Sequence, residues 1–212
     1  EYKPMELIAV DEKIGSRVIF SFDHIRHIHG VNCDPVDGSL WITTGDNDDE
    51  STIWHMSTLK AQPQPILSGS QQSRAVQLLF DKSYIYFGTD TPLEQNYIYR
   101  LDRVNYQVKR LHPVSNSVFY GCTVNDTHIF ASVCEPSDVN EISNVRIYTS
   151  DKQDTSTWSE LIKIPKDVWP MRLFQYGQVL FPIGQNKSNQ LYFTPMGVDG
   201  DQNTYRTNLI IK

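Results

Sequence analysis

Apolar residues fall in short runs of strand length along most of the chain. Short runs such as SLWITT, YIYFGT and HIFASV are rich in β-branched and aromatic side chains. Clusters of Asp, Asn, Gly, Pro and Ser separate these runs, as turns separate strands. No segment sustains the i, i+3, i+4, i+7 spacing of an amphipathic helix. The pattern therefore predicts an all-β protein.

The strand-length runs return in the same order about every 45 residues, a period typical of four-stranded β-propeller blades. The first runs of the four copies are HIHGVNCDP, AVQLLFDKS, VFYGCTVND and PMRLFQYGQ, and the second runs are SLWITTGD, YIYFGTD, HIFASVCE and QVLFPIGQ. One copy cannot bury both of its faces alone, which favours radial packing of blades. We therefore predict a single β-propeller domain over residues 1–212, with blades at 25–68, 72–114, 116–166 and 168–212.

Two further runs precede the first copy. ELIAVD and RVIFSFD look like the third and fourth strands of a partial blade at residues 1–24. The chain then holds about four and a half antiparallel blades, whereas propellers usually close with more. An unclosed propeller exposes sheet edges. We therefore expect a fragment of a propeller of about six to eight blades, or missing strands supplied by another segment or subunit.

One turn carries a family resemblance. The stretch YTSDKQDTSTWSELIKIP resembles the Asp-box, Ser/Thr-x-Asp-x-Gly-x-Thr-Trp, of sialidases and other bacterial neuraminidase repeat (BNR) proteins, with matches at Thr149, Asp151, Thr157 and Trp158. In that family the Asp caps backbone N–H groups and the Trp packs between blades. The hairpin in HGVNCDPVDGSLWITTGD is also similar to sialidase-like blades. The resemblance implies a sialidase-like propeller that binds carbohydrate and acts on it as a glycosidase, a hydrolase.

The repeat alignment gathers polar residues at one mouth of the predicted channel, formed by the starts of first strands and the loops between second and third strands. Guanidinium groups suit a carboxylate because two N–H donors match its two oxygens. The sialidase resemblance adds a Tyr nucleophile helped by a Glu. We predict ligand binding by Arg26, Arg74, Arg172, Asp46, Asp48 and Trp169, and catalytic roles for His27, His29, Tyr120 and Glu135.

The two histidines stand one residue apart, so strand alternation places His27 and His29 on the same face. Together they could bind a transition metal or donate to a sugar hydroxyl, but the sequence identifies no third ligand, and no metal site is assigned. The acidic run DNDDE, residues 46–50, offers oxygen ligands that calcium prefers. A solvated acidic loop explains the same run, so calcium is a hypothesis and the cofactor stays unknown.

Composition excludes several classes of function. The formal charge of −6 and the scattered Lys and Arg residues argue against nucleic-acid binding. No apolar run approaches the ~18 residues of a membrane span. The three cysteines are too few for a disulfide framework and are predicted to be free. The first residues, EYKPMELIAV, do not resemble a signal peptide, so we expect a cytoplasmic chain or one whose leader was removed.

Three functions stay open. The first is a propeller that binds a glycan or another polar small ligand at its mouth. The second is a glycoside hydrolase or lyase that uses the same residues. The third is a structural or protein-interaction propeller without catalysis, since a fold alone does not specify a reaction.

Overall fold

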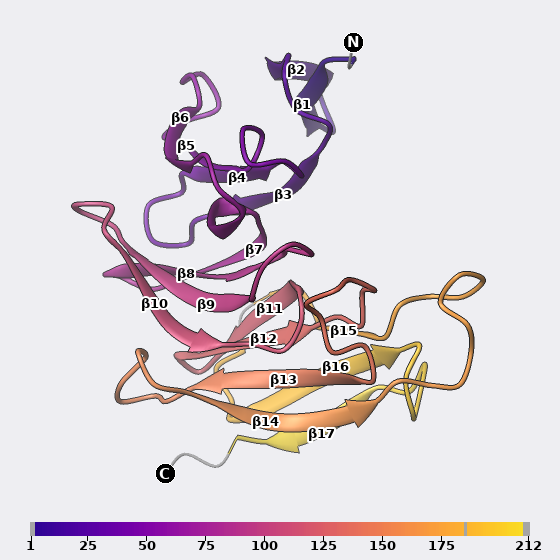
Figure 1. The fold of residues 1–212 in the computed structure, drawn as a ribbon. Coiled ribbons are helices and arrows are strands. Elements are labelled where there is room, and N and C mark those ends of the chain that lie inside the picture. Colours follow the sequence, from indigo (N-terminus) through magenta and orange to yellow (C-terminus); the bar gives the residue numbers. More distant parts are fainter. Residues whose placement is uncertain (1–2, 185, 210–212) are drawn as a thin grey trace. The chain divides into compact units, whose positions relative to one another are not determined.

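The computed structural model describes residues 3–184 and 186–209. Over these residues the secondary structure is β strand apart from one 3-10 turn, η1 (Gln71–Ser73). Each sheet is an antiparallel meander of strands that follow one another in the chain (Figure 1). The chain divides into two compact units, residues 1–76 and 77–212, and each is described by itself.

The first unit holds two sheets. β1 and β2 form a two-stranded ribbon from the predicted runs ELIAVD and RVIFSFD, and that this ribbon is a partial blade stays a prediction. β3 to β6 form the first complete meander, and Leu7, Phe22, Ile25, Ile42 and Met56 build the core of the unit. The strands are β1 (Met5–Asp11), β2 (Gly15–Phe22), β3 (Ile28–Cys33), β4 (Leu40–Thr44), β5 (Thr52–Met56) and β6 (Gln64–Ser68).

The second unit holds three sheets, in the orders β7–β10, β11–β14 and β15–β17. β7 begins at the end of the first unit. Aromatic rings of Tyr86, Phe130, Tyr148 and Trp158 fill the core between the first two of these sheets. The strands are β7 (Ala75–Phe80), β8 (Tyr84–Thr89), β9 (Tyr97–Asp102), β10 (Val108–Pro113), β11 (Val118–Val124), β12 (Thr127–Ser132), β13 (Asn144–Ser150), β14 (Trp158–Pro165), β15 (Gln178–Leu180), β16 (Gln190–Met196) and β17 (Tyr205–Asn208).

The last sheet differs from the prediction. Its expected first strand, in residues 170–178, does not form, and the sheet has three strands. The backbone N–H groups of Leu173 and Phe174 both donate to the Pro170 carbonyl, at 3.0 and 3.1 Å, and so close a turn. The side chains of Leu173 and Phe174 are exposed as a result. The predicted final strand TNLIIK is observed only as far as Asn208, and residues 210–212 lie outside the described residues.

An aspartate closes one hairpin in each of three sheets: β1–β2, β9–β10 and β13–β14. One carboxylate oxygen of Asp11, Asp102 or Asp151 accepts two backbone N–H groups, in each case from the residues two and three positions later. This arrangement is an Asx turn. Trp158 after the third turn is buried and stacks on Phe130, with ring centroids 5.6 Å apart. Since Asp11 and Asp102 make the same turn without the Thr-Trp of the Asp-box, the turn indicates hairpin geometry and not one particular family.

The three cysteines are free, as predicted. Burial raises the pKa of the Cys122 and Cys134 thiols to about 12, so both are protonated and unreactive at neutral pH. Among the described residues, no helix is long and apolar enough to cross a membrane.

Candidate functional site

The loop between β4 and β5 positions Asp46. Gly45 has φ +112°, and a Cβ at this position would lie 2.4 Å from the Ser51 nitrogen, so only glycine fits. The Ser51 N–H and hydroxyl both donate to the Asn47 carbonyl, at 2.9 and 2.8 Å. The Thr44 hydroxyl donates to the Glu50 carbonyl at 2.9 Å. The loop therefore has a defined conformation in which the Asp46 side chain is fixed beside the start of β3.

Residues just before β7 fix Asp46 from the other side. Gln71 Nε2 and Arg74 Nη1 both donate to the Asp46 carbonyl oxygen, at 3.0 and 3.1 Å. Gln71 Nε2 also donates to Asp48 Oδ1 at 2.9 Å. Arg74 Nη2 lies 3.3 Å from Asp46 Oδ1, so this arginine contacts both the backbone and the carboxylate.

A β-bulge at the start of β3 directs His29 toward the same loop. Ile28 pairs with Thr44 and Gly30 with Thr43, which makes His29 the extra residue of the bulge. Bulges of this kind re-aim side chains and occur often beside functional sites. The His29 side chain is 5% exposed, whereas His27, immediately before the strand, is 49% exposed. Their rings stack with centroids 4.8 Å apart, so the His27 ring covers the His29 ring.

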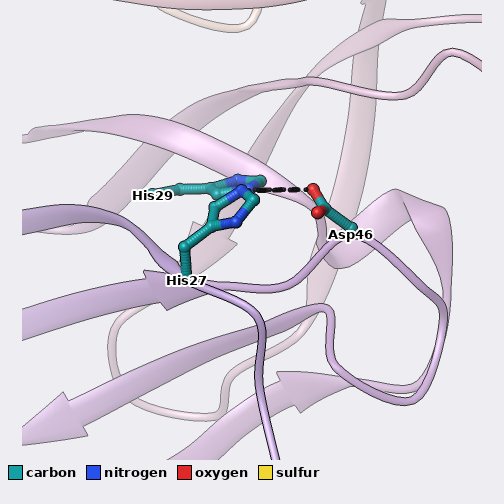
Figure 2. Close-up of side chains that lie close together, drawn as sticks. All are labelled: His27, His29 and Asp46. Atoms are coloured by element: carbon teal, nitrogen blue, oxygen red, sulfur yellow. Dashed lines mark hydrogen bonds and ion pairs between the residues drawn. The ribbon is translucent and has the colours of Figure 1, made fainter. Parts of the chain in front are cut away.

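Both imidazoles approach one carboxylate oxygen (Figure 2). His27 Nε2 and His29 Nε2 lie 3.3 and 3.4 Å from Asp46 Oδ1. Arg26 Nη1 lies 4.0 Å from Asp46 Oδ2, and its side chain is 44% exposed. We call Arg26, His27, His29, Asp46 and Arg74 the Asp46 cluster. Three segments that are separate in sequence form it, and all belong to the first unit.

The electrostatics of the cluster keep His29 neutral. Burial lowers the pKa of His29, the positive charge of Arg74 and the neighbouring His27 lower it further, and Asp46 opposes them. A neutral imidazole has one nitrogen with a lone pair, which can bind a metal or accept a hydrogen bond. The exposed guanidinium of Arg26 adds a positive charge on the solvent side of the cluster.

The acidic run 46–50 does not gather its carboxylates. Asp46 faces the histidines, Asp48 accepts from Gln71, and Glu50 Oε1 accepts from Asn47 Nδ2 at 3.0 Å. Within the described ranges, the single group of three or more His, Cys, Asp or Glu ligand atoms close enough for one ion is His27, His29 and Asp46. Calcium binding by the run stays a hypothesis, and the geometry adds no observation in its favour.

The structure brings together five predicted site residues and holds Asp48 nearby through Gln71. The other four lie in the second unit, so a common mouth that contains both sets stays a prediction. Tyr120 is half-buried on β11, and Glu135 follows β12, where its carbonyl accepts from Asn140 Nδ2 at 3.1 Å. Trp169 is 58% exposed, with its ring 5.2 Å from that of Phe174, and Arg172 is exposed in the turn after β14.

Sequence reasoning missed Gln71, which is buried in η1 and positions both Asp46 and Asp48. Nothing in the local sequence QQSRA distinguishes it, because its role depends on a loop that lies 23 to 25 residues away.

A second polar network, in the second unit, was also missed. Tyr86 Oη donates to Asp81 Oδ2 at 2.8 Å and lies 2.6 Å from Thr155 Oγ1. His128 Nε2 lies 3.8 Å from the same Asp81 oxygen. Burial would raise the pKa of Asp81, but the nearby His128 imidazole and hydrogen bonds from two backbone N–H groups and Tyr86 outweigh it and lower that pKa to about 2. A polar His128 at the start of an otherwise apolar strand was the available signal.

The sequence matches no known family profile and no curated protein. Solved structures do show the same fold. A structure from work on two prolyl endopeptidases matches 97% of this chain with a TM-score of 0.58 and 10% identity, and the chain spans 33% of that protein's length. A chain of a nidogen/laminin complex matches 93% with a TM-score of 0.55 and 13% identity, over 88% of its own length. TolB from Acinetobacter baumannii matches 92% with a TM-score of 0.51 and 20% identity, over 46% of its length.

These similarities agree with the five antiparallel sheets of the chain, and they show a partial β-propeller. They do not support the sialidase or BNR assignment, nor the glycosidase and carbohydrate-binding functions that the Asp-box resemblance implied. Similar structures at 10–20% identity indicate the fold alone.

Proposed function

We propose that this chain is the ligand-binding part of a β-propeller and that the Asp46 cluster binds a small, oxygen-rich anionic ligand. The class that we favour is an acidic sugar, whose carboxylate suits a guanidinium fork. The observation that carries the proposal is the exposure of Arg26 and His27 side by side at the solvent edge, with Arg74 and His29 behind them.

Charge supports this choice of ligand. The chain as a whole carries a formal charge of −6, yet two arginines and two histidines converge on one carboxylate. Asp46 and the buried Glu50 balance the two arginines overall, so the support comes from the exposed guanidinium of Arg26, which is a cationic N–H donor at the surface. The fixed β4–β5 loop and the buried His29 also make the site rigid, which lowers the entropic cost of binding.

Binding without reaction is the function that the geometry supports. The predicted catalytic set divides between the units, with His27 and His29 in the first and Tyr120 and Glu135 in the second. A glycoside hydrolase or lyase activity therefore stays a prediction. Release of reducing sugar from acidic oligosaccharides would test it separately from binding.

The test of the proposed function is calorimetric titration with a panel of uronic and sialic acids and matched neutral sugars, in buffer that contains a chelator. We expect acidic sugars to bind and neutral sugars to bind at least tenfold more weakly. Arg26→Ala should abolish binding, whereas Arg17→Ala, an exposed arginine on β2 of the same unit, should preserve it. Equal binding of neutral and acidic sugars, or equal loss in both variants, would contradict the proposal.

A second candidate function is protein binding by the second unit. Exposed apolar side chains lie in the residues between β14 and β16, which include the segment that failed to form the predicted strand: Val168, Trp169, Leu173, Phe174 and Ile183. β15 is the end strand of its sheet. A strand supplied by a second copy of the chain would cover both features. One similar propeller was solved in a nidogen/laminin complex, which shows that the fold can take part in a protein assembly.

Sedimentation velocity over a range of concentrations tests this second candidate. We expect self-association that Leu173→Ser weakens. Val104→Ser replaces a valine that is also largely exposed, in the turn between β9 and β10, and it should leave the association unchanged. A chain that stays monomeric at all concentrations would count against it.

A further inference from the structure

We propose that His27, His29 and Asp46 bind one divalent transition-metal ion, with zinc as the representative. These residues are also part of the proposed anion site, but the metal site goes beyond that function and requires no organic ligand. The third group that the sequence did not identify for the two histidines is Asp46, whose carboxylate lies against both rings (Figure 2).

Distances separate a metal site from an ordinary ion pair. Charge-assisted hydrogen bonds between nitrogen and a carboxylate are typically about 2.7–2.9 Å long. In a tetrahedral zinc site with metal–ligand distances of about 2.0–2.1 Å, neighbouring donor atoms are about 3.3–3.4 Å apart. The observed separations from Asp46 Oδ1 are 3.3 Å for His27 Nε2 and 3.4 Å for His29 Nε2. Both separations match the spacing of ligands around a metal ion. The His29 contact is also a long hydrogen bond, and the ligand atoms of all three groups lie within 4.8 Å of one another.

The donor types indicate which ions the site selects. Two imidazole nitrogens and one carboxylate oxygen suit zinc, cobalt and nickel. Calcium and magnesium prefer six or more oxygen ligands and would find one carboxylate here. The proposal therefore excludes calcium and magnesium as the preferred ions of this cluster.

The surrounding structure fixes the ligands in advance. His29 is buried at the bulge of β3, and Gly45 sets the conformation of the loop that carries Asp46. Arg74 and Gln71 hold the Asp46 backbone through its carbonyl oxygen. Because those two bonds do not use the carboxylate, they persist when the carboxylate binds a metal. Such outer contacts orient metal ligands and raise affinity.

The charges around the site reduce its affinity without preventing binding. The positive charges of Arg26 and Arg74 oppose the binding of a cation. Two carboxylates balance these charges: Asp46, and the buried Glu50, whose Oε1 lies 3.8 Å from Arg26 Nε. The arginines would then favour an anion on the metal. We therefore expect weaker zinc binding than at a site without neighbouring cations, and stronger binding when a carboxylate or phosphate is also present.

Three protein ligands leave a fourth position open. His27 is half-exposed and Asp46 is 18% exposed, so the open position faces solvent and not the core. Structural zinc sites are usually closed by four protein ligands, whereas sites that bind exchangeable ligands keep one position free. The cluster is thus of the exchangeable type.

The test is titration of the metal-free chain with Co²⁺, followed by its visible absorption, and with Zn²⁺ followed by calorimetry, with no organic ligand added. We expect one ion per chain and an absorption spectrum typical of tetrahedral cobalt. His27→Ala should weaken zinc binding more than the roughly 10- to 100-fold that loss of an outer-shell contact costs. Asp46→Asn keeps the size and most contacts of the side chain and should weaken zinc binding about as much as His27→Ala does.

His24→Ala is the matched control, because His24 is an exposed histidine of the same segment outside the cluster. It should bind zinc as the unchanged chain does. No binding of either metal, or equal binding in His27→Ala and His24→Ala when circular dichroism shows both are folded, would overturn the metal site. Because sugar binding is measured with a chelator, each proposal can fail while the other survives.

Discussion

The chain contains two groups in which histidine meets aspartate, and they differ in their access to solvent. In the second unit, Asp81, Tyr86, His128 and Thr155 form a closed network beside Trp158, and Tyr86 and His128 are almost completely buried. In the first unit, the Asp46 cluster has two half-exposed members, and the contacts of its imidazoles with Asp46 Oδ1, at 3.3 and 3.4 Å, are longer than the 2.8 Å hydrogen bond from Tyr86 to Asp81.

The difference indicates different roles. The hydrogen bonds of Tyr86 Oη, 2.8 Å to Asp81 and 2.6 Å to Thr155, satisfy a buried hydroxyl and so stabilise packing. A cluster with long distances and an open side contributes little to stability and can bind something else. The predictions below test this contrast, in order of decreasing effect.

The largest effect is expected where the closed network meets the aromatic core. Trp158→Ala removes the ring that stacks on Phe130, and it should lower the free energy of unfolding by about 3–5 kcal/mol. Trp169→Ala is the matched control, because that ring is 58% exposed, and it should change stability by less than about 0.5 kcal/mol. Urea unfolding followed by circular dichroism measures both. Equal effects would refute a structural role for the Trp of the Asp-box-like turn.

Tyr86→Phe removes the hydroxyl between Asp81 and Thr155 and leaves their polar atoms without it. We expect the free energy of unfolding to fall by about 1–2 kcal/mol. Hydrogen exchange of the β8 and β12 amides should become faster by the factor that corresponds to this loss of unfolding free energy. Tyr106→Phe, at an exposed tyrosine, serves as the comparison and should leave those amides unchanged.

The closed network also predicts a pH dependence. Folding lowers the pKa of Asp81 from 3.8 to about 2, so its contribution to stability is complete above pH 3.8 and is lost as the pH falls toward about 2. His128 and Tyr86 are the side chains that face the Asp81 carboxylate. Urea midpoints at several pH values measure the effect, and Asp81→Asn should flatten it. If the urea midpoint of Asp81→Asn changed with pH as steeply as that of the unchanged chain, the pH dependence would not come from Asp81.

The smallest effect on stability is expected in the open cluster. Arg26→Ala and His27→Ala should each change the free energy of unfolding by less than about 0.5 kcal/mol, because both side chains are half-exposed. Arg26→Ala should also lose ligand binding, and His27→Ala should lose metal binding. A loss of several kcal/mol in either would mean that the open cluster is structural, like the closed one.

Much of the fold could be predicted from the sequence. Short runs rich in β-branched and aromatic residues located the strands, even those such as β12 that are buried on both faces, and clusters of Asp, Asn, Gly, Pro and Ser marked the turns. The prediction failed at residues 170–178, where apolar residues alternate as in a strand but the Pro170 carbonyl closes a turn. Periodicity reports the preference of side chains for burial and does not detect a competing local hydrogen bond.

The candidate site was predicted less completely. Repeat alignment brought Arg26, Arg74 and Asp46 to one place, and the structure places them in contact. Neither the bulge at His29 nor the contribution of Gln71 has a signal in the sequence, since both depend on how a strand pairs or on a loop far along the chain. The relation of the cluster to Tyr120 and Arg172 stays a prediction.

Every sheet joins strands that are consecutive in the chain, so its backbone pairing closes only short loops. Contacts of low sequence separation form quickly and with a small entropic cost. During synthesis, the β3–β6 sheet with its Asp46 loop can therefore begin to pair once residue 68 has left the ribosome, before the strands from β8 onward have emerged from it. Arg74, which follows shortly afterwards, would then dock onto a preformed loop.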